Sequence, residues 1–194
     1  KIWNASRFVI MNLPEDAKPA HMPDTTKFDL ADSWIFDRLN HTVSEVTRLF
    51  DEYKFGEAGR ELYNFIWNDF CDWYIEISKV ALNGDDEELK ARKQENLIWI
   101  LDQILRLMHP IMPFVTEKLW LSMPHEGKSI MTAKYPETHA EFENKQADSD
   151  MAFLIEVIKA VRNIRMEVNA PMSSQIDIMI QLDDEANKHI LDDN

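Results

Sequence analysis

Apolar residues recur at intervals of three and four along most of the first 124 positions. This spacing is typical of helices that bury one face. Asp29, with Asp32 three residues later, resembles a capping box at the start of a helix. The pattern predicts helices over residues 1–13, 30–53 and 57–82, a fourth that ends at His109-Pro110, and a short fifth that holds Phe114 to Trp120.

The helix predicted over residues 57–82 has the widest apolar surface and should be a central element of the bundle. Three further aromatic residues and Tyr74 widen its stripe, and Asn83-Gly84 is a helix-ending signal. An ideal helical repeat assigns its buried stripe to Leu62, Ile66, Phe70, Trp73, Ile77 and Val80.

The pattern changes after Pro124. Residues 129–135 should form an extended connection and residues 148–168 another amphipathic helix. Residues 175–182 alternate strictly between apolar and other positions, which is typical of a β-strand. Because a lone strand is not stable, its partners should lie elsewhere. We therefore predict a mainly α protein: an antiparallel helical bundle over residues 1–124 and a small, incomplete C-terminal α/β extension over residues 125–194.

Composition agrees with a helical soluble domain. The 194 residues include four glycines and eight prolines, fewer than a turn-rich β fold needs. The single cysteine excludes an intramolecular disulfide and fits a reducing compartment. Neither a signal peptide nor a membrane-spanning apolar run is visible, so we expect a cytoplasmic protein without a membrane partner.

The net charge of −14 disfavours nucleic acid as a partner at first sight. Its distribution weakens this objection. Residues 1–60 carry eight Lys and Arg against ten Asp and Glu, a balance of −2, so the acidity belongs mostly to the second part. A local cationic surface on the first part therefore stays possible.

Motifs for catalysis and metal binding are missing from the sequence. It has no His-Glu-x-x-His, no Glu-x-x-His, no cysteine pair and no glycine-rich phosphate loop. Cys71, inside an aromatic helix, should be a buried structural thiol. We expect a binding module that is not an enzyme by itself and holds no metal or cofactor.

Three stretches resemble the valyl-tRNA synthetases, a family of class I enzymes. They are KIWNASRFV at 1–9, NFIWNDFCDWY at 64–74, and LMHPIMPF at 107–114 followed by EKLW at 117–120. The third is shared with the isoleucine, leucine and methionine members, whereas the first two together look most like the valine member. VRNIR at 161–165, ahead of Pro171, also resembles the valyl continuation.

The resemblance implies the anticodon-binding domain of such an enzyme. The ATP-site signatures, the editing domain and the C-terminal coiled coil of the family are absent, so this chain alone should not charge tRNA. ATP and magnesium would belong to a catalytic domain outside it. Because Lys1 already lies in a predicted helix and residues 185–194 look like the start of another, we expect a piece of a longer protein. Its partners would be the anticodon loop and the other domains, and it should be a monomer.

The resemblance also places the RNA site on the first helix and the start of the second. Unpaired bases are read by stacking and by hydrogen bonds to their edges, while Lys and Arg contact phosphates. Two assignments stay open: Trp34 stacks on RNA or belongs to the core, and Asn4 contacts RNA or a neighbouring helix. Arg92 and Lys93 should be solvated charges. The candidate RNA-binding residues are Lys1, Asn4, Arg7, Lys27, Phe28, Trp34 and Arg38.

Three other interpretations compete with this one. A related anticodon domain, such as the isoleucyl one, would keep the framework and change the preferred anticodon. An acidic helical module for protein interaction would bind partners at high salt, where phosphate-driven binding fails. An enzyme in its own right would turn over ATP with valine.

Overall fold

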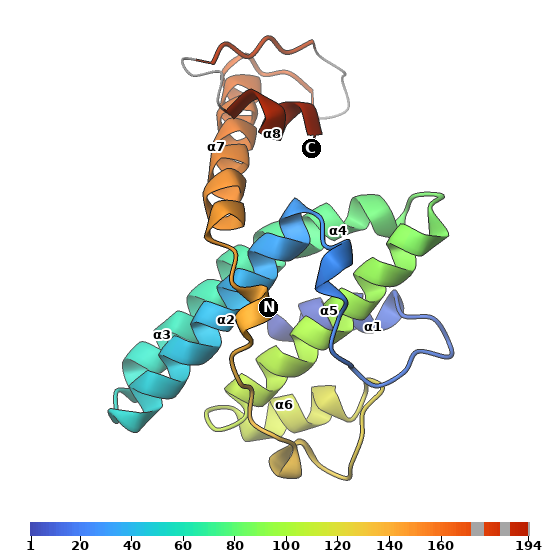
Figure 1. Cartoon of the computed structure of the whole chain (residues 1–194), viewed down its shortest axis with the longest axis vertical. Helices are drawn as coiled ribbons and strands as arrows, with labels where there is room; N and C mark the ends of the chain where they lie inside the picture. The colour runs from blue at the N-terminus through green and yellow to red at the C-terminus, as the bar shows by residue number, and fades with distance from the viewer. Residues whose placement is uncertain (172–176, 183–186, 194) are drawn as a thin grey trace. The chain divides into compact units, whose positions relative to one another are not determined.

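The computed structural model describes residues 1–171, 177–182 and 187–193 (Figure 1). The chain divides into two compact units, Lys1–Glu143 and Asn144–Asn194.

The first unit is built of helices, as the apolar spacing predicted, and no strand occurs among the residues described. Short 3-10 turns are η1 (Thr25–Lys27), η3 (Ile130–Thr132) and η4 (Ala140–Phe142). None of the helices seen is long and apolar enough to cross a membrane. The helices are α1 (Ile2–Met11), α2 (Leu30–Asp51), α3 (Phe55–Asn64), η2 (Phe65–Tyr74), α4 (Ile75–Leu82), α5 (Glu87–Met108) and α6 (Pro113–Trp120).

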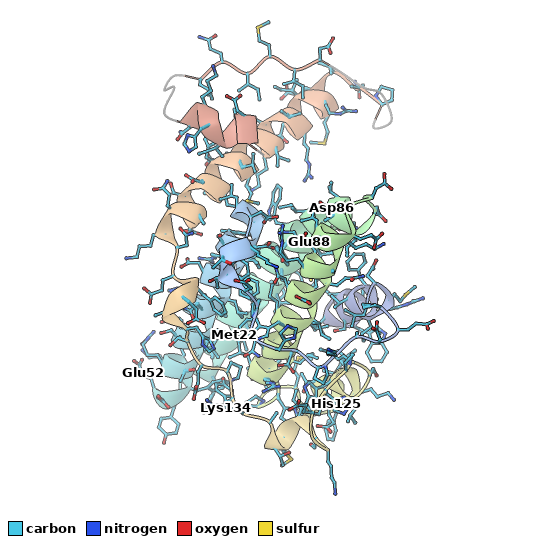
Figure 2. The ribbon with its side chains drawn as sticks, turned by 45° about the vertical axis from the view of Figure 1, so that its right-hand side comes forward. Met22, Glu52, Asp86, Glu88, His125 and Lys134 are labelled. Carbon is cyan, nitrogen blue, oxygen red and sulfur yellow. The ribbon has the colours of Figure 1, made fainter. Side chains whose placement is uncertain are left out.

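The two long helices begin at aspartate caps. Asp29 accepts a hydrogen bond from the backbone N–H of Asp32 at 2.8 Å, and the Asp32 side chain accepts one from the N–H of Asp29 at 3.4 Å. This confirms the predicted capping box. Asp86 similarly accepts from two backbone N–H groups at the start of α5, and Figure 2 shows it with Glu88 at that end of the helix.

Helices α3, η2 and α4 form one continuous rod that runs antiparallel to α2 (Figure 1). The middle segment, η2, is a π-helix, whose turns are wider than those of an α-helix. The wider turns move the buried face by one position. The predicted stripe is therefore wrong after Phe70: Val80 is 79% exposed, and Tyr74, Ser78 and Ala81 are buried beside Cys71, Ile75 and Leu82.

Segment 125–143 packs on the helices and belongs to the first unit. Phe142 is buried, with its ring 4.9 Å from that of Phe36 and 5.2 Å from that of Trp99. The backbone N–H of His139 donates to Asn40 Oδ1 at 2.8 Å. The compact unit thus runs to Glu143, whereas a functional domain boundary after residue 124 stays a prediction.

The second unit contains α7 (Lys145–Glu167) and α8 (Lys188–Asp193), which contact each other. The predicted α/β extension is not supported, because residues 177–182 form no strand. Ile178 and Ile180 are about half exposed, and the described part of the unit offers them no neighbouring strand. The start of the predicted strand, residues 175–176, lies outside the described residues.

Candidate nucleic-acid interface

Helix α1 presents one polar face to solvent. Ala5 and Val9 are buried, while Asn4 and Arg7 are exposed. Neither exposed side chain makes a hydrogen bond or an ion pair with any residue that the structure describes. Trp3, one turn before Arg7, is 51% exposed and was not among the predicted site residues. The four-residue spacing from Arg7 was the signal that could have placed both on one face.

Lys1 and Arg38 are held in ion pairs with η2. Lys1 Nζ pairs with Asp72 and lies 4.1 Å from the centroid of the Trp67 ring. Arg38 Nε donates to Asp69 Oδ2 at 3.0 Å. These contacts fasten α1 and α2 to η2, so each cation would have to leave its carboxylate before it could bind a phosphate.

The two aromatic candidates are turned toward the protein. Trp34 is only 4% exposed, which favours the core over the RNA site in its open assignment. Stacking of its indole on a base is not compatible with this burial. Phe28 is half-buried, and its ring lies 4.5 Å from that of Phe36.

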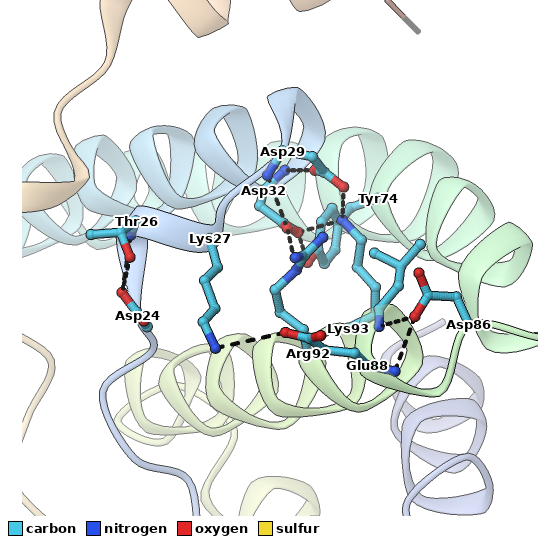
Figure 3. A network of polar contacts seen from close by, with 11 residues as sticks. Asp24, Thr26, Lys27, Asp29, Asp32, Tyr74, Asp86, Glu88, Arg92 and Lys93 are labelled. Atoms are coloured by element: carbon cyan, nitrogen blue, oxygen red, sulfur yellow. Dashed lines mark hydrogen bonds and ion pairs between the residues drawn. The ribbon is translucent and has the colours of Figure 1, made fainter.

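Lys93 is the centre of a buried charge network, contrary to the expectation of a solvated charge (Figure 3). It is 2% exposed, and its ammonium group lies 2.6 Å from a carboxylate oxygen of Asp29 and 2.6 Å from one of Asp32. The Tyr74 hydroxyl donates to the same Asp32 oxygen at 2.7 Å. The network joins the start of α2, the end of η2 and the first half of α5.

Burial and the ammonium group of Lys93 shift the pKa of the Asp29 and Asp32 carboxyl groups in opposite directions. Burial raises the pKa of Asp32, and the nearby charge of Lys93 only partly offsets it. Burial would also raise the pKa of Asp29, but the charge and hydrogen bond of Lys93 hold it below its usual value. Burial raises the pKa of Tyr74 well above its usual range, so its hydroxyl stays a donor.

Burial also raises the pKa of the Cys71 thiol to about 11. The thiol is therefore protonated at neutral pH, as expected of a structural cysteine.

A cavity of about 180 Å³ lies between η1 and α5. Lys27 stands beside it, with its ammonium group 3.9 Å from a carboxylate oxygen of Glu88, and both are exposed (Figure 3). Arg92 Nε and Asn96 Nδ2 are buried and have no hydrogen-bond partner among the described residues. The residues that line it are Asp24, Lys27, Glu88, Ala91, Arg92, Glu95 and Asn96.

A larger hollow of about 630 Å³ adjoins this cavity, because Ala91 and Glu95 line both. Its other wall is the loop after α1, residues 13–21. The Gln94 amide donates to the backbone oxygen of Asn12 at 2.6 Å, which ties the end of α1 to α5. The two hollows thus extend from the end of α1 across α5 to Lys27, and the larger one has a mostly apolar lining.

The sequence matches the family model of the anticodon-binding domain of tRNA ligase over residues 32–180. Over all 194 residues the chain is 92% identical to valine–tRNA ligase of Lactobacillus johnsonii and 89% identical to that of Lactobacillus acidophilus. It is 52% identical over 186 residues to valine–tRNA ligase of Bacillus cereus.

The chain spans 22% of the length of the two Lactobacillus proteins and 21% of the Bacillus one. Both Lactobacillus proteins match the whole chain, and the family model matches most of it. The protein therefore belongs to the family of anticodon-binding domains of tRNA ligases, and over its whole length it is similar to a part of valine–tRNA ligases.

Proposed function

We propose that this chain binds the anticodon arm of valine tRNA and positions the tRNA for charging by a catalytic domain outside the chain. The observation that carries the proposal is the exposed face of α1, where Arg7 and Asn4 are free of contacts with the residues described. A guanidinium group without a protein partner can give its fork of donors to a phosphate or a base edge.

The other candidate cations are less available than Arg7. Lys1 and Arg38 already neutralise Asp72 and Asp69. Lys27 keeps only a long contact with an exposed carboxylate, so it can exchange that partner for RNA at little cost. We therefore assign the RNA contact to Arg7 and Asn4 first and to Lys27 second, and Trp3 adds an exposed ring on which a base can stack.

A net charge of −14 implies weak RNA binding that depends on salt. Affinity should fall as salt rises, because each neutralised phosphate releases counterions. This dependence separates the proposal from an acidic protein-interaction module, which would bind at high salt.

Replacing Arg7 by alanine should weaken binding of a valine anticodon stem–loop. Loss of hydrogen bonds to a charged group costs about 1.5–3 kcal/mol, which corresponds to roughly ten- to a hundredfold in affinity. Fluorescence anisotropy at low salt measures the change, and circular dichroism should stay that of the parent because the side chain is exposed.

Arg60→Ala is the matched control, since Arg60 is an exposed arginine on α3 and its loss changes the net charge equally. Its affinity should stay close to that of the parent. Equal affinities of the Arg7→Ala and Arg60→Ala variants would exclude α1 as the contact surface.

On this proposal the chain itself holds no cofactor. ATP and Mg²⁺ would serve the catalytic part of a longer ligase, whose remaining domains are the second partner of the chain. We propose a monomer that acts in the cytoplasm, where its tRNA substrate is charged.

A further inference from the structure

We propose that an apolar groove beside the start of α1 receives an amphipathic helical segment of the same ligase, the segment joined to Lys1. This inference rests on the proposal that the remaining domains of a longer ligase are partners of the chain. It deepens that proposal because it names the surface and the segment that covers it. It does not depend on RNA binding.

The groove lies between α1, the rod of α3 and η2, and the turn that joins α5 to α6. Its volume is about 220 Å³. Large apolar side chains gathered in one hollow mark an interaction surface, whereas single exposed ones are ordinary. Four such side chains line the groove and are each at least 37% exposed: Tyr63, Trp67, Ile111 and Met112.

The lining fits the apolar face of a helix better than a small polar ligand. Lys1 is the charged residue among those that line the groove, and its ammonium group is already paired with Asp72. Pockets for small ligands hold convergent polar groups that fix orientation, whereas amphipathic helices lie in apolar grooves. From Gly59 to Trp67 the groove follows the rod for roughly 12 Å, or about two helical turns.

Gly59 indicates that another backbone approaches the rod closely. It lies inside α3 and lines the groove. Glycine destabilises a helix interior relative to alanine, and a Cβ atom at Gly59 would have no contact within 4 Å among the described residues. No described neighbour therefore explains the missing side chain, whereas a helix packed into the groove does.

The first turn of α1 points to the segment that fills the groove. Lys1 and Ile2 line it, so residues joined to Lys1 would leave α1 beside it. No side chain caps this turn, whereas Asp29 and Asp86 cap α2 and α5. A preceding turn of helix would supply carbonyl oxygens to its backbone N–H groups. The Lactobacillus relatives, of whose length the chain spans 22%, have room for such a segment.

A second copy of the chain is a poorer occupant than a segment of the same ligase. Each copy carries a net charge of −14, and like charges of this size oppose association. A segment joined to Lys1 is instead held beside the groove at a high effective concentration. A small groove is therefore sufficient to bind it.

The test is hydroxyl-radical footprinting without RNA, which measures how fast exposed side chains are modified. It compares the chain alone, the chain lengthened before Lys1, and the whole Lactobacillus johnsonii ligase with this chain in place of its matched stretch. The lengthening takes about 20 residues from that ligase, which span about 30 Å as a helix. Mass spectrometry reads Trp67 and Met112, with Met131 as the reference because it is 79% exposed and does not line the groove.

Gly59→Leu places a side chain in the groove and should exclude the segment. Gly56→Leu is the matched control, because Gly56 lies about one turn earlier on α3, also has open space around its Cβ position and does not line the groove. Met112→Glu is a second variant in case the leucine disturbs α3, since it places a charge at an exposed edge of the groove.

We expect modification of Trp67 and Met112 to be several-fold slower in the lengthened chain and in the ligase than in the chain alone. Lengthening should leave Met131 unchanged. In Gly59→Leu and Met112→Glu, lengthening should no longer slow the modification of Trp67, whereas in Gly56→Leu it should.

Three results would overturn the inference. The first is no protection in either longer protein. The second is protection in the whole ligase alone, which would assign the groove to another domain. The third is protection of the chain alone as its concentration rises, which would assign it to a second copy. Because no RNA is present, a failure of this inference is distinguished from a failure of RNA binding.

Discussion

Lys93→Met should lower the free energy of unfolding by about 3–5 kcal/mol, the usual cost of removing one partner from a buried ion pair. Methionine fills much of the same volume but leaves the carboxylates of Asp29 and Asp32 without their ammonium group. Asp32 is fully buried, so water cannot replace the lost charge. Urea denaturation near neutral pH measures the change.

Lys90→Met, three residues earlier on α5, is the control for loss of a lysine charge. Its ammonium group lies 3.7 Å from a carboxylate oxygen of Glu87, which is largely exposed, and a surface pair of this kind contributes about 0–1 kcal/mol. Similar losses in the two variants would contradict a stabilising role of the buried network.

Acidification should reduce the deficit of Lys93→Met. Without the lysine, burial and Asp29 both raise the pKa of Asp32 in the folded variant above its unfolded value. The folded state then binds the proton more readily, so stability rises as pH falls through that raised pKa. The difference in the free energy of unfolding between the variant and the parent should therefore be smaller at about pH 5 than near pH 7.

Trp34→Ala is the second change with a large expected effect, about 3–5 kcal/mol lower stability. The indole is 4% exposed on α2, so its removal leaves a void in the core. Thermal unfolding should show the loss directly. Trp34→Phe keeps most of the apolar volume and should retain the RNA affinity of the parent.

The opposite pattern would place the indole in the RNA site. A Trp34→Ala variant that unfolds like the parent but binds RNA more weakly would contradict the core assignment. So would a Trp34→Phe variant that keeps its stability and loses affinity.

The positions of the helices could be predicted because their signals are local. Asp29 with Asp32, Asp86, Asn83-Gly84 and Pro110 mark starts and ends through contacts within a few residues. The exception shows the limit: a π-helix at 65–74 cannot be recognised from a 3.6-residue repeat. The π-helix moves the buried face from Trp73 to Tyr74, and farther along from Val80 to Ala81.

The predicted strand after Pro171 failed for a related reason. Alternating apolar residues form a strand only when another strand supplies hydrogen bonds. The residues described around Ile178 and Ile180 supply none.

Which candidate cations lack a protein partner could not be predicted from the sequence, because ion pairs join residues that are distant in sequence. Lys1 and Asp72 are 71 residues apart, and Lys93 and Asp32 are 61 apart. No local pattern tells a paired cation from a free one. Sequence alone therefore grouped Lys1 and Arg38 with Arg7, of which only Arg7 is free of ion pairs among the described residues.

The central claim is that this chain reads an anticodon. The most direct measurement is a low-salt titration of the chain with two tRNA transcripts that are identical except for the anticodon, one carrying the valine anticodon and the other a changed middle base. We predict tighter binding of the valine form, with an affinity that falls as salt rises. Equal binding of the two forms, or no binding of either, would contradict the claim.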